Sequence, residues 1–141
     1  MGEFYTLKGY SLHDDNRLST AGEDYLEMIC RLYTNQSIVR LTDISKELHV
    51  RPSSASKMIQ RLCAHGYLRA EKYAEIHLTE RGRRVGEYLM RRHDVLLRFL
   101  CWLNGSDDEL EQAEKIEHFI SPRTLENIER LLYQAQPPKK Q

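Results

Sequence analysis

The chain has 141 residues, and its 21 basic and 21 acidic side chains leave no net charge; this length accommodates one substantial core and a small second module. It contains no run of 18 apolar residues and no basic-then-apolar signal pattern, so we expect a cytoplasmic protein without a membrane partner. Three widely spaced cysteines (Cys30, Cys63 and Cys101) without a Cys-x-x-Cys pair exclude a zinc ribbon or disulfide framework and are expected to be buried hydrophobes.

The ends of the chain are predicted to be flexible. Residues 1–18 show no clear periodicity and are expected to form an arm. His13, Asp14 and Asp15 lie in it, and we interpret them as a surface cluster rather than a metal site. Residues 137–141 are polar and proline-rich, which predicts a disordered tail.

The first helix is predicted to begin at Ser19 or Thr20, either of which can accept a hydrogen bond as an N-cap. Glu23 and Asp24 then fall in the first turn, where the helix dipole favours acids. Asp24 and Glu27 are three residues apart, so both carboxylates project from one flank.

A helix-turn-helix is predicted next. Thr42 is expected to cap a short helix over Asp43–Leu48, and Pro52 suits the first position of a second helix over Ser53–His65. Gly66 follows, where a left-handed residue ends a helix. In this motif the second helix enters the major groove of DNA.

The charge pattern of the second helix agrees with DNA binding. Four bases and no acid lie between Arg51 and Arg69, although an ordinary solvated basic face would look the same. The residues expected to contact DNA are Arg51, Ser53, Ser54, Ser56, Lys57 and Gln60.

A β-hairpin wing is predicted from Tyr67–Lys72 and Glu75–Leu78. Arg69 and Lys72 suit contacts with the sugar–phosphate backbone. The turn between the strands, Tyr73-Ala74, lacks the glycine that marks a tight hairpin.

Thr79 is predicted to cap a long helix that runs to about Leu103. It has more apolar surface than a small winged domain needs, which indicates a subunit interface. His93 falls on the stripe, where a lone histidine is usually a core residue. The apolar positions are Val85, Tyr88, Leu89, Leu96, Phe99, Leu100, Trp102 and Leu103.

The acidic part of the chain follows Asn104-Gly105. Ser106 and Glu109 match a capping box, which predicts that a helix opens there. On that helix Glu114 would share a face with Glu117 and His118. Taken alone, this cluster is more often a solvated acidic face than a metal site. A last helix is predicted from Ser121-Pro122, with Leu125, Ile128, Leu131 and Leu132 facing inward.

Four motifs can be considered together: D-Y-L-E at 24–27, R-P-S-S-A-S-K-M-I-Q-R-L at 51–62, L-x-x-R-H at 89–93, and E-x-x-E-H followed by F-I-S at 114–121. In combination they resemble the diphtheria-toxin-repressor family of iron- and manganese-dependent regulators, and within it the manganese transport regulators. The resemblance implies a mainly α fold with a small β-wing, comprising a winged helix-turn-helix domain (19–80) and a helical dimerisation and metal-binding domain (81–136).

The implied function is that of a metal-activated repressor, not an enzyme. It would bind a palindromic double-stranded operator as a homodimer, take no small-molecule substrate, and control manganese uptake genes. The implied metal ligands are Asp24, Glu27, His93, Glu114, Glu117 and His118. Carboxylates and imidazoles without thiolate favour Mn²⁺, with one or two ions per subunit, and Fe²⁺, Co²⁺, Cd²⁺ or Zn²⁺ as substitutes.

Two alternatives remain open. A dimeric winged-helix regulator could respond to iron(II), to an organic ligand or to oxidation of Cys63. A dimetal carboxylate enzyme is disfavoured, because the chain lacks the Glu-x-x-His motif on two helices. The wing departs from the family pattern, since its tip carries Glu75 and no glycine.

Overall fold

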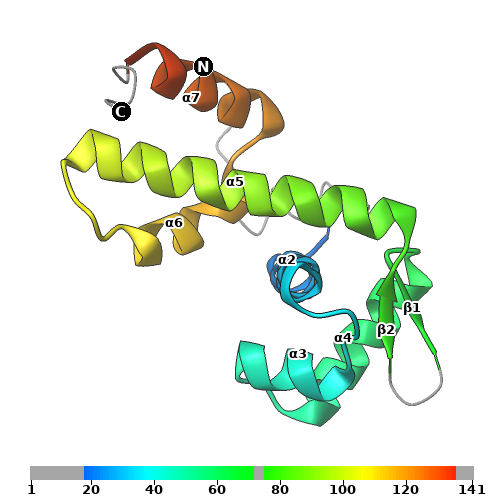
Figure 1. Cartoon of the computed structure of the whole chain (residues 1–141). Coiled ribbons are helices and arrows are strands. Elements are labelled where there is room, and N and C mark those ends of the chain that lie inside the picture. Colours follow the sequence, from blue (N-terminus) through cyan, green and yellow to red (C-terminus); the bar gives the residue numbers. More distant parts are fainter. Residues whose placement is uncertain (1–17, 72–74, 136–141) are drawn as a thin grey trace, which may run out of the picture.

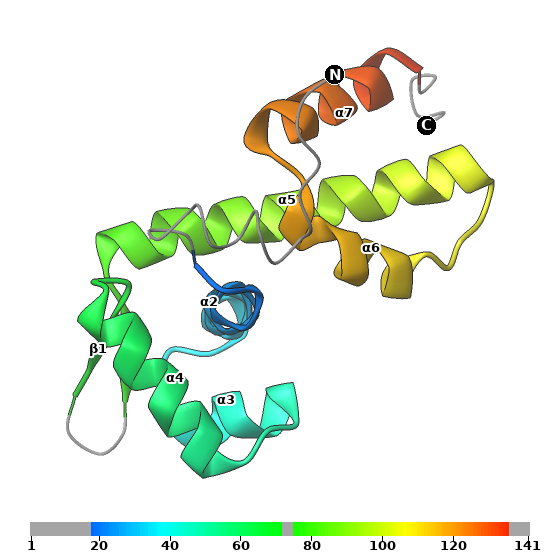
Figure 2. The same cartoon turned by 180° about the vertical axis from the view of Figure 1, so that it is seen from behind.

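The computed structural model describes residues 18–71 and 75–135. A single long helix, α5 (Glu80–Asn104), runs through the molecule and carries a cluster of elements near each of its ends (Figures 1 and 2). The predicted fold class, mainly helical with a two-stranded wing, is confirmed. Within the described ranges, no helix is long and apolar enough to cross a membrane.

The first half contains the helix-turn-helix. Helix α2 (Thr20–Asn35) begins as predicted, because the Ser19 hydroxyl accepts a hydrogen bond from the amide of Gly22. Helices α3 (Leu41–Leu48) and α4 (Pro52–Ala64) then pack against each other. The amide of Arg40 donates to the carboxylate of Asp43, so α3 begins before the predicted cap, Thr42.

The wing follows α4. Strands β1 (Leu68–Ala70) and β2 (Ile76–Leu78) are antiparallel, with Arg69 opposite His77, and both are shorter than the sequence predicted. An isolated bridge joins Arg40 to Glu75 and ties the wing to the start of α3. Lys72 and the predicted turn at 73–74 lie outside the described residues, as do the predicted arm up to residue 17 and the tail.

Helix α5 packs closely against the wing at its start. The Thr79 hydroxyl caps it by accepting from the amide of Gly82, as predicted. A Cβ at Gly82 would lie 1.9 Å from the carbonyl oxygen of Tyr67, so only glycine permits this approach.

The second half consists of α6 (Leu110–Ile116), a 3₁₀ turn η2 (Glu117–Phe119) and α7 (Pro122–Ala135). The predicted capping box is wrong. Ser106 accepts from the amide of Asp108 and closes a local turn, while Glu109 is the residue before the helix and makes no side-chain cap.

Two apolar clusters form the core. The larger joins α2, the helix-turn-helix and the wing to Leu89 of α5, and the smaller packs Val95 and Leu96 against α7. The central part of the α5 stripe is therefore covered by α2 and α7 of the same chain and is not available to the predicted subunit interface. Trp102 and Leu103, beyond those helices, remain exposed.

Two smaller predictions of burial were too broad. On α7, Leu125 and Leu132 are buried, but Leu131 is 43% exposed because it lies off the face that meets α5. Cys30 is buried, whereas Cys63 and Cys101 are only half-buried; all three are free thiols.

Candidate metal centre

The six predicted ligands line one pocket. Asp24 and Glu27 come from α2, His93 from α5, Glu114 from the end of α6, and Glu117 and His118 from η2. The pocket therefore lies where the helix that supports the DNA-binding half meets the second half of the chain. Met28, Arg31, Glu47, Leu48 and His49 complete its lining.

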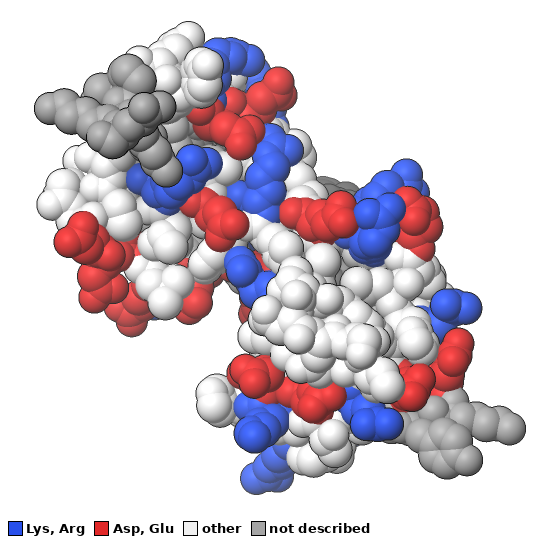
Figure 3. Space-filling view, in the orientation of Figure 1, with Lys and Arg blue, Asp and Glu red and all other residues white. Residues whose placement is uncertain are grey.

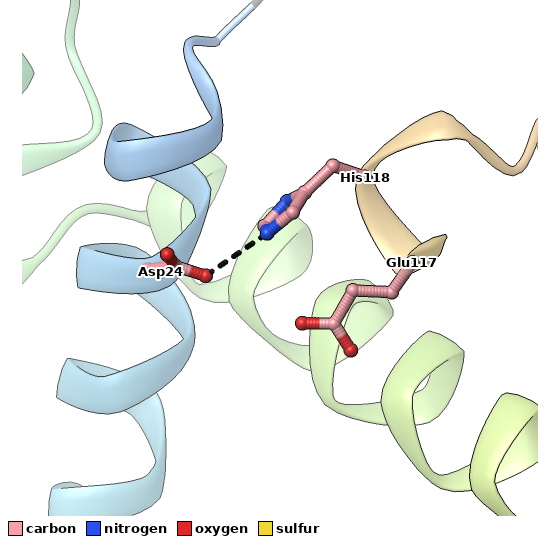
Figure 4. Close-up of side chains that lie close together, drawn as sticks. All are labelled: Asp24, Glu117 and His118. Atoms are coloured by element: carbon pink, nitrogen blue, oxygen red, sulfur yellow. Dashed lines mark ion pairs between the residues drawn. The ribbon is translucent and has the colours of Figure 1, made fainter. Parts of the chain in front are cut away.

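Two groups of potential ligand atoms form within the pocket. Asp24, Glu117 and His118 make one group, and Glu27, His93 and Glu117 make the other, with the ligand atoms of each group within 4.8 Å of one another. Figure 4 shows Asp24 on α2 facing His118 and Glu117 across the gap between the elements. Glu117 belongs to both groups, so its carboxylate is the centre of the arrangement.

Glu114 differs from the other five predicted ligands. It lines the pocket, but its side chain is exposed and it belongs to neither group. The reason is local, because α6 ends at Ile116 and the chain continues as a 3₁₀ turn. Glu117 and His118 are turned inward by that change, whereas Glu114 remains at the rim.

Carboxylates and imidazoles already pair with one another in this pocket. Nδ1 of His93 lies 2.8 Å from Oε2 of Glu117, and this hydrogen bond raises the pKa of His93 despite its burial. Glu27 accepts a hydrogen bond from Arg31 at 2.9 Å. Burial and the negative charge of Glu117 nevertheless raise the pKa of Glu27. The imidazoles of His93 and His118 must each present an unprotonated nitrogen to bind a metal.

His118 is held between two acids of α2. Its Nε2 lies 3.2 Å from Asp24 and its Nδ1 lies 2.8 Å from Glu23, and hydrogen bonds to these two raise its pKa to about 9. Burial opposes ionisation of Glu23, but hydrogen bonds with His118 and Arg92 outweigh it and lower the pKa of that carboxyl.

Glu23 and Arg92 were not predicted as site residues. Glu23 was interpreted only as a favourable acid in the first turn, and Arg92 only as part of the L-x-x-R-H motif. Their side chains are 12% and 4% exposed and meet between α2 and α5. Two neighbouring acids at 23 and 24 are the one sequence signal that points to Glu23.

The donor set fits a hard or borderline divalent ion. It contains carboxylate oxygens and imidazole nitrogens without thiolate, which are the ligands that Mn²⁺ accepts. The carboxylate of Glu117 is only 4% exposed, and a buried carboxylate requires a compensating positive charge.

A further group of potential ligands lies on the wing, where His77 stands 3.5 Å from both Glu71 and Glu75. Glu71 is half exposed, and the two acids also approach Arg69 and Arg40 at 4.0 Å. Surface ion pairs account for this arrangement.

The predicted DNA-contacting residues lie mainly on the surface of α4. Arg51, Lys57 and Gln60 are exposed there. Ser53, Ser54 and Arg69 are also exposed, and Ser56 is half-buried. Figure 3 shows Lys and Arg side chains at the lower tip of the molecule, over the helix-turn-helix, while acids gather over α6 and the turn before it.

Comparison with known families matches nearly the whole described chain. A family model described as iron dependent repressor, N-terminal DNA binding domain, matches residues 17–76. A second, described as iron dependent repressor, metal binding and dimerisation domain, matches residues 79–137.

Individual relatives agree with this assignment. The transcriptional regulator MntR of Lysinibacillus sphaericus is 37% identical over 107 residues, covering 75% of this chain and 77% of that protein. Among solved structures, a manganese-dependent transcriptional repressor in complex with manganese is 30% identical, with a TM-score of 0.72. The match covers 79% of this chain and 52% of that one.

ScaR with bound Zn²⁺ is 31% identical, with a TM-score of 0.68 over 79% of this chain and 53% of that one. This chain thus spans about half the length of these two solved proteins. The predicted resemblance is confirmed: the chain belongs to the iron dependent repressor family of metal-dependent, DNA-binding transcriptional repressors, which are not enzymes.

Proposed function

We propose that this protein is a manganese-activated repressor that binds a palindromic DNA operator as a homodimer and controls genes of manganese uptake. The observation that carries the proposal is the shared position of Glu117, whose buried carboxylate belongs to two groups of oxygen and nitrogen ligands. One group draws a residue from α2 and the other draws residues from both α2 and α5.

Manganese is favoured by the chemistry of the donors. Four carboxylates, on Asp24, Glu27, Glu114 and Glu117, nearly balance the charge of two divalent ions. None of the three cysteines lines the pocket, so the soft ligand that favours Zn²⁺ or Cu⁺ is lacking there. The solved manganese-dependent transcriptional repressor in complex with manganese supports the same choice.

The ligand residues would act by joining two parts of the chain. Asp24 and Glu27 project from α2, whose apolar face forms the core with the helix-turn-helix. His93, Glu117 and His118 belong to α5 and η2. A bound divalent ion supplies the positive charge that lets these carboxylates approach one another. The position of α2 on α5 would then be fixed, and with it the spacing of the two recognition helices in a dimer.

DNA recognition is assigned to α4 and the wing. Residues near the start of α4, with Lys57 and Gln60 further along it, would reach base edges and phosphates of the major groove. Arg69 on the wing would contact the backbone, and Lys72, which lies outside the described residues, is proposed for the same role. The complete set on α4 is Arg51, Ser53, Ser54, Ser56, Lys57 and Gln60.

The proposal is tested by measuring affinity for a duplex selected from random-sequence DNA in the presence of Mn²⁺. The same duplex is then titrated at constant salt with Fe²⁺ under anaerobic conditions, with Co²⁺ and Zn²⁺, and with a chelator. We expect Mn²⁺ to strengthen binding by about 5- to 150-fold, the usual range of such coupling. Equal affinity with Mn²⁺ and with chelator would refute metal activation, and a response to Fe²⁺ alone would replace manganese by iron.

A further inference from the structure

Glu23 makes a contact with His118 that the six proposed ligands do not explain. Its Oε1 lies 2.8 Å from Nδ1 of His118, on the edge of the ring that faces away from Asp24. A carboxylate can only accept a hydrogen bond, so the 2.8 Å contact with Glu23 places a proton on Nδ1, in preference to the longer 3.4 Å approach of Arg92 Nη2 to the same nitrogen. The other nitrogen, Nε2, lies 3.2 Å from Asp24, within the group that contains Glu117.

Glu23 and Asp24 are consecutive residues of α2, so their side chains leave the helix about 100° apart, as 3.6 residues per turn requires. The imidazole of His118 lies between them, with one nitrogen against each carboxylate. Rotation of the ring by half a turn about Cβ–Cγ would place ring carbons where Nδ1 and Nε2 now stand, so this orientation is the one that presents Nε2 to the ligand group.

Arg92 also holds the carboxylate of Glu23. Its two terminal nitrogens lie 3.2 Å from the two carboxylate oxygens of Glu23, and the arginine side chain is 4% exposed. A buried arginine bound to both oxygens leaves the carboxylate little freedom to turn. Arg92 of α5, Glu23 of α2 and His118 of η2 therefore form one cluster, in which Nη2 of Arg92 also lies 3.4 Å from Nδ1 of His118.

We propose that Glu23 is a positioning residue for the candidate metal centre, accepting the Nδ1 proton of His118 so that Nε2 faces the metal. This inference rests on the proposed metal site. Carboxylates that orient a ligating histidine in this way change metal affinity by about 10- to 100-fold when they are removed.

The test needs variants that retain the fold, because removing Glu23 alone leaves Arg92 as an unpaired buried charge. Replacing both by apolar residues of similar volume avoids that cost, so Glu23→Met with Arg92→Met removes the acceptor. Glu23→Gln with Arg92→Met restores an acceptor oxygen without the charge. Glu87→Gln, on the exposed face of α5, is the matched control.

Mn²⁺ affinity is measured by calorimetry on each folded variant. We expect the double methionine variant to bind at least tenfold more weakly than the wild type, and the glutamine variant to recover most of that loss. Equal affinity of the two double variants would overturn the role of Glu23. Absence of Mn²⁺ binding by the wild type would overturn the proposed function as well, which separates the two failures.

A second measurement does not depend on any variant. Nitrogen NMR of the histidine rings in wild-type protein loaded with diamagnetic Zn²⁺ distinguishes the metal-bound nitrogen from the protonated one. The proposal requires His118 to bind through Nε2 and to retain the proton on Nδ1. Metal on Nδ1 of His118 would overturn it.

Discussion

At the scale of single residues, burial separates the two glutamates of the E-x-x-E-H motif. Glu117 is 3% exposed and contacts His93, whereas Glu114 is exposed at the rim of the pocket. The sequence alone assigned them equal roles, because it placed both on one continuous helix. The 3₁₀ turn after Ile116 makes them different, and the consequence is measurable.

Glu117→Gln is expected to weaken Mn²⁺ binding more than Glu114→Gln does. Glu117 is shared by both ligand groups, so Glu117→Gln should weaken Mn²⁺ binding by more than about 100-fold. That value is the upper end of the range for residues that only orient a ligand. For Glu114 we expect a loss below about tenfold, which is the lower end of that range. Calorimetric titration measures both, with Glu111→Gln on the exposed face of α6 as the control. Equal losses for Glu114 and Glu117 would contradict this ranking.

Five of the six predicted ligands lie close together in the structure, and their role as ligands stays a prediction. Helical spacing placed Asp24 with Glu27, and Glu117 and His118 with Glu114. The resemblance joined these sets to His93, and all but Glu114 form the two groups. Glu23 and Arg92 could not be predicted in the same way. Their meeting depends on how α2 crosses α5, and no local spacing encodes a contact between residues 69 positions apart.

At the scale of elements, α5 determines where both halves of the molecule lie. Its predicted bounds and its Thr79 cap were correct, because capping residues and apolar periodicity are local signals. The start of α6 was predicted wrongly, because Ser106 and Glu109 satisfy the local capping pattern, but Ser106 accepts from the amide of Asp108 in a turn instead. The close approach of Gly82 to Tyr67 is a tertiary feature, and it was not predicted.

Gly82→Ala should destabilise the protein by about 3 kcal/mol, the upper part of the usual range for overpacking, because backbone must move to admit the methyl group. Gly66→Ala is the comparison, since its φ of +84° adds strain of about 1–2 kcal/mol but its nearest neighbour is 3.7 Å away. Urea unfolding compares the two. A larger loss for Gly66→Ala would refute the importance of the contact with Tyr67.

At the scale of the whole molecule, the surface available for self-association includes only the end of the predicted α5 stripe, together with residues beyond it. The middle of the α5 stripe is covered within the chain, while Trp102, Leu103, Leu110 and Phe119 are between 41% and 58% exposed. These four come from the end of α5, from α6 and from η2, in the half matched by the metal binding and dimerisation model. We therefore expect the homodimer to use this end.

Trp102→Asp combined with Leu103→Asp should convert the dimer to a monomer without loss of fold, because both side chains are already exposed in the single chain. Sedimentation equilibrium measures the mass and circular dichroism checks the fold. Ile38→Asp, at a comparably exposed position in the other half, is the control and should leave the dimer intact. A dimer that survives the double change would exclude this surface.

The central claim is that metal and DNA stabilise the same arrangement of α2 on α5. Linkage then requires that DNA strengthen Mn²⁺ binding by the same factor by which Mn²⁺ strengthens DNA binding. The direct measurement is a calorimetric titration of Mn²⁺ into the wild-type protein, with and without a saturating selected duplex at fixed salt. We predict tighter Mn²⁺ binding in the presence of DNA, by a factor of about 5–150. An affinity for Mn²⁺ that is unchanged by DNA would contradict the account.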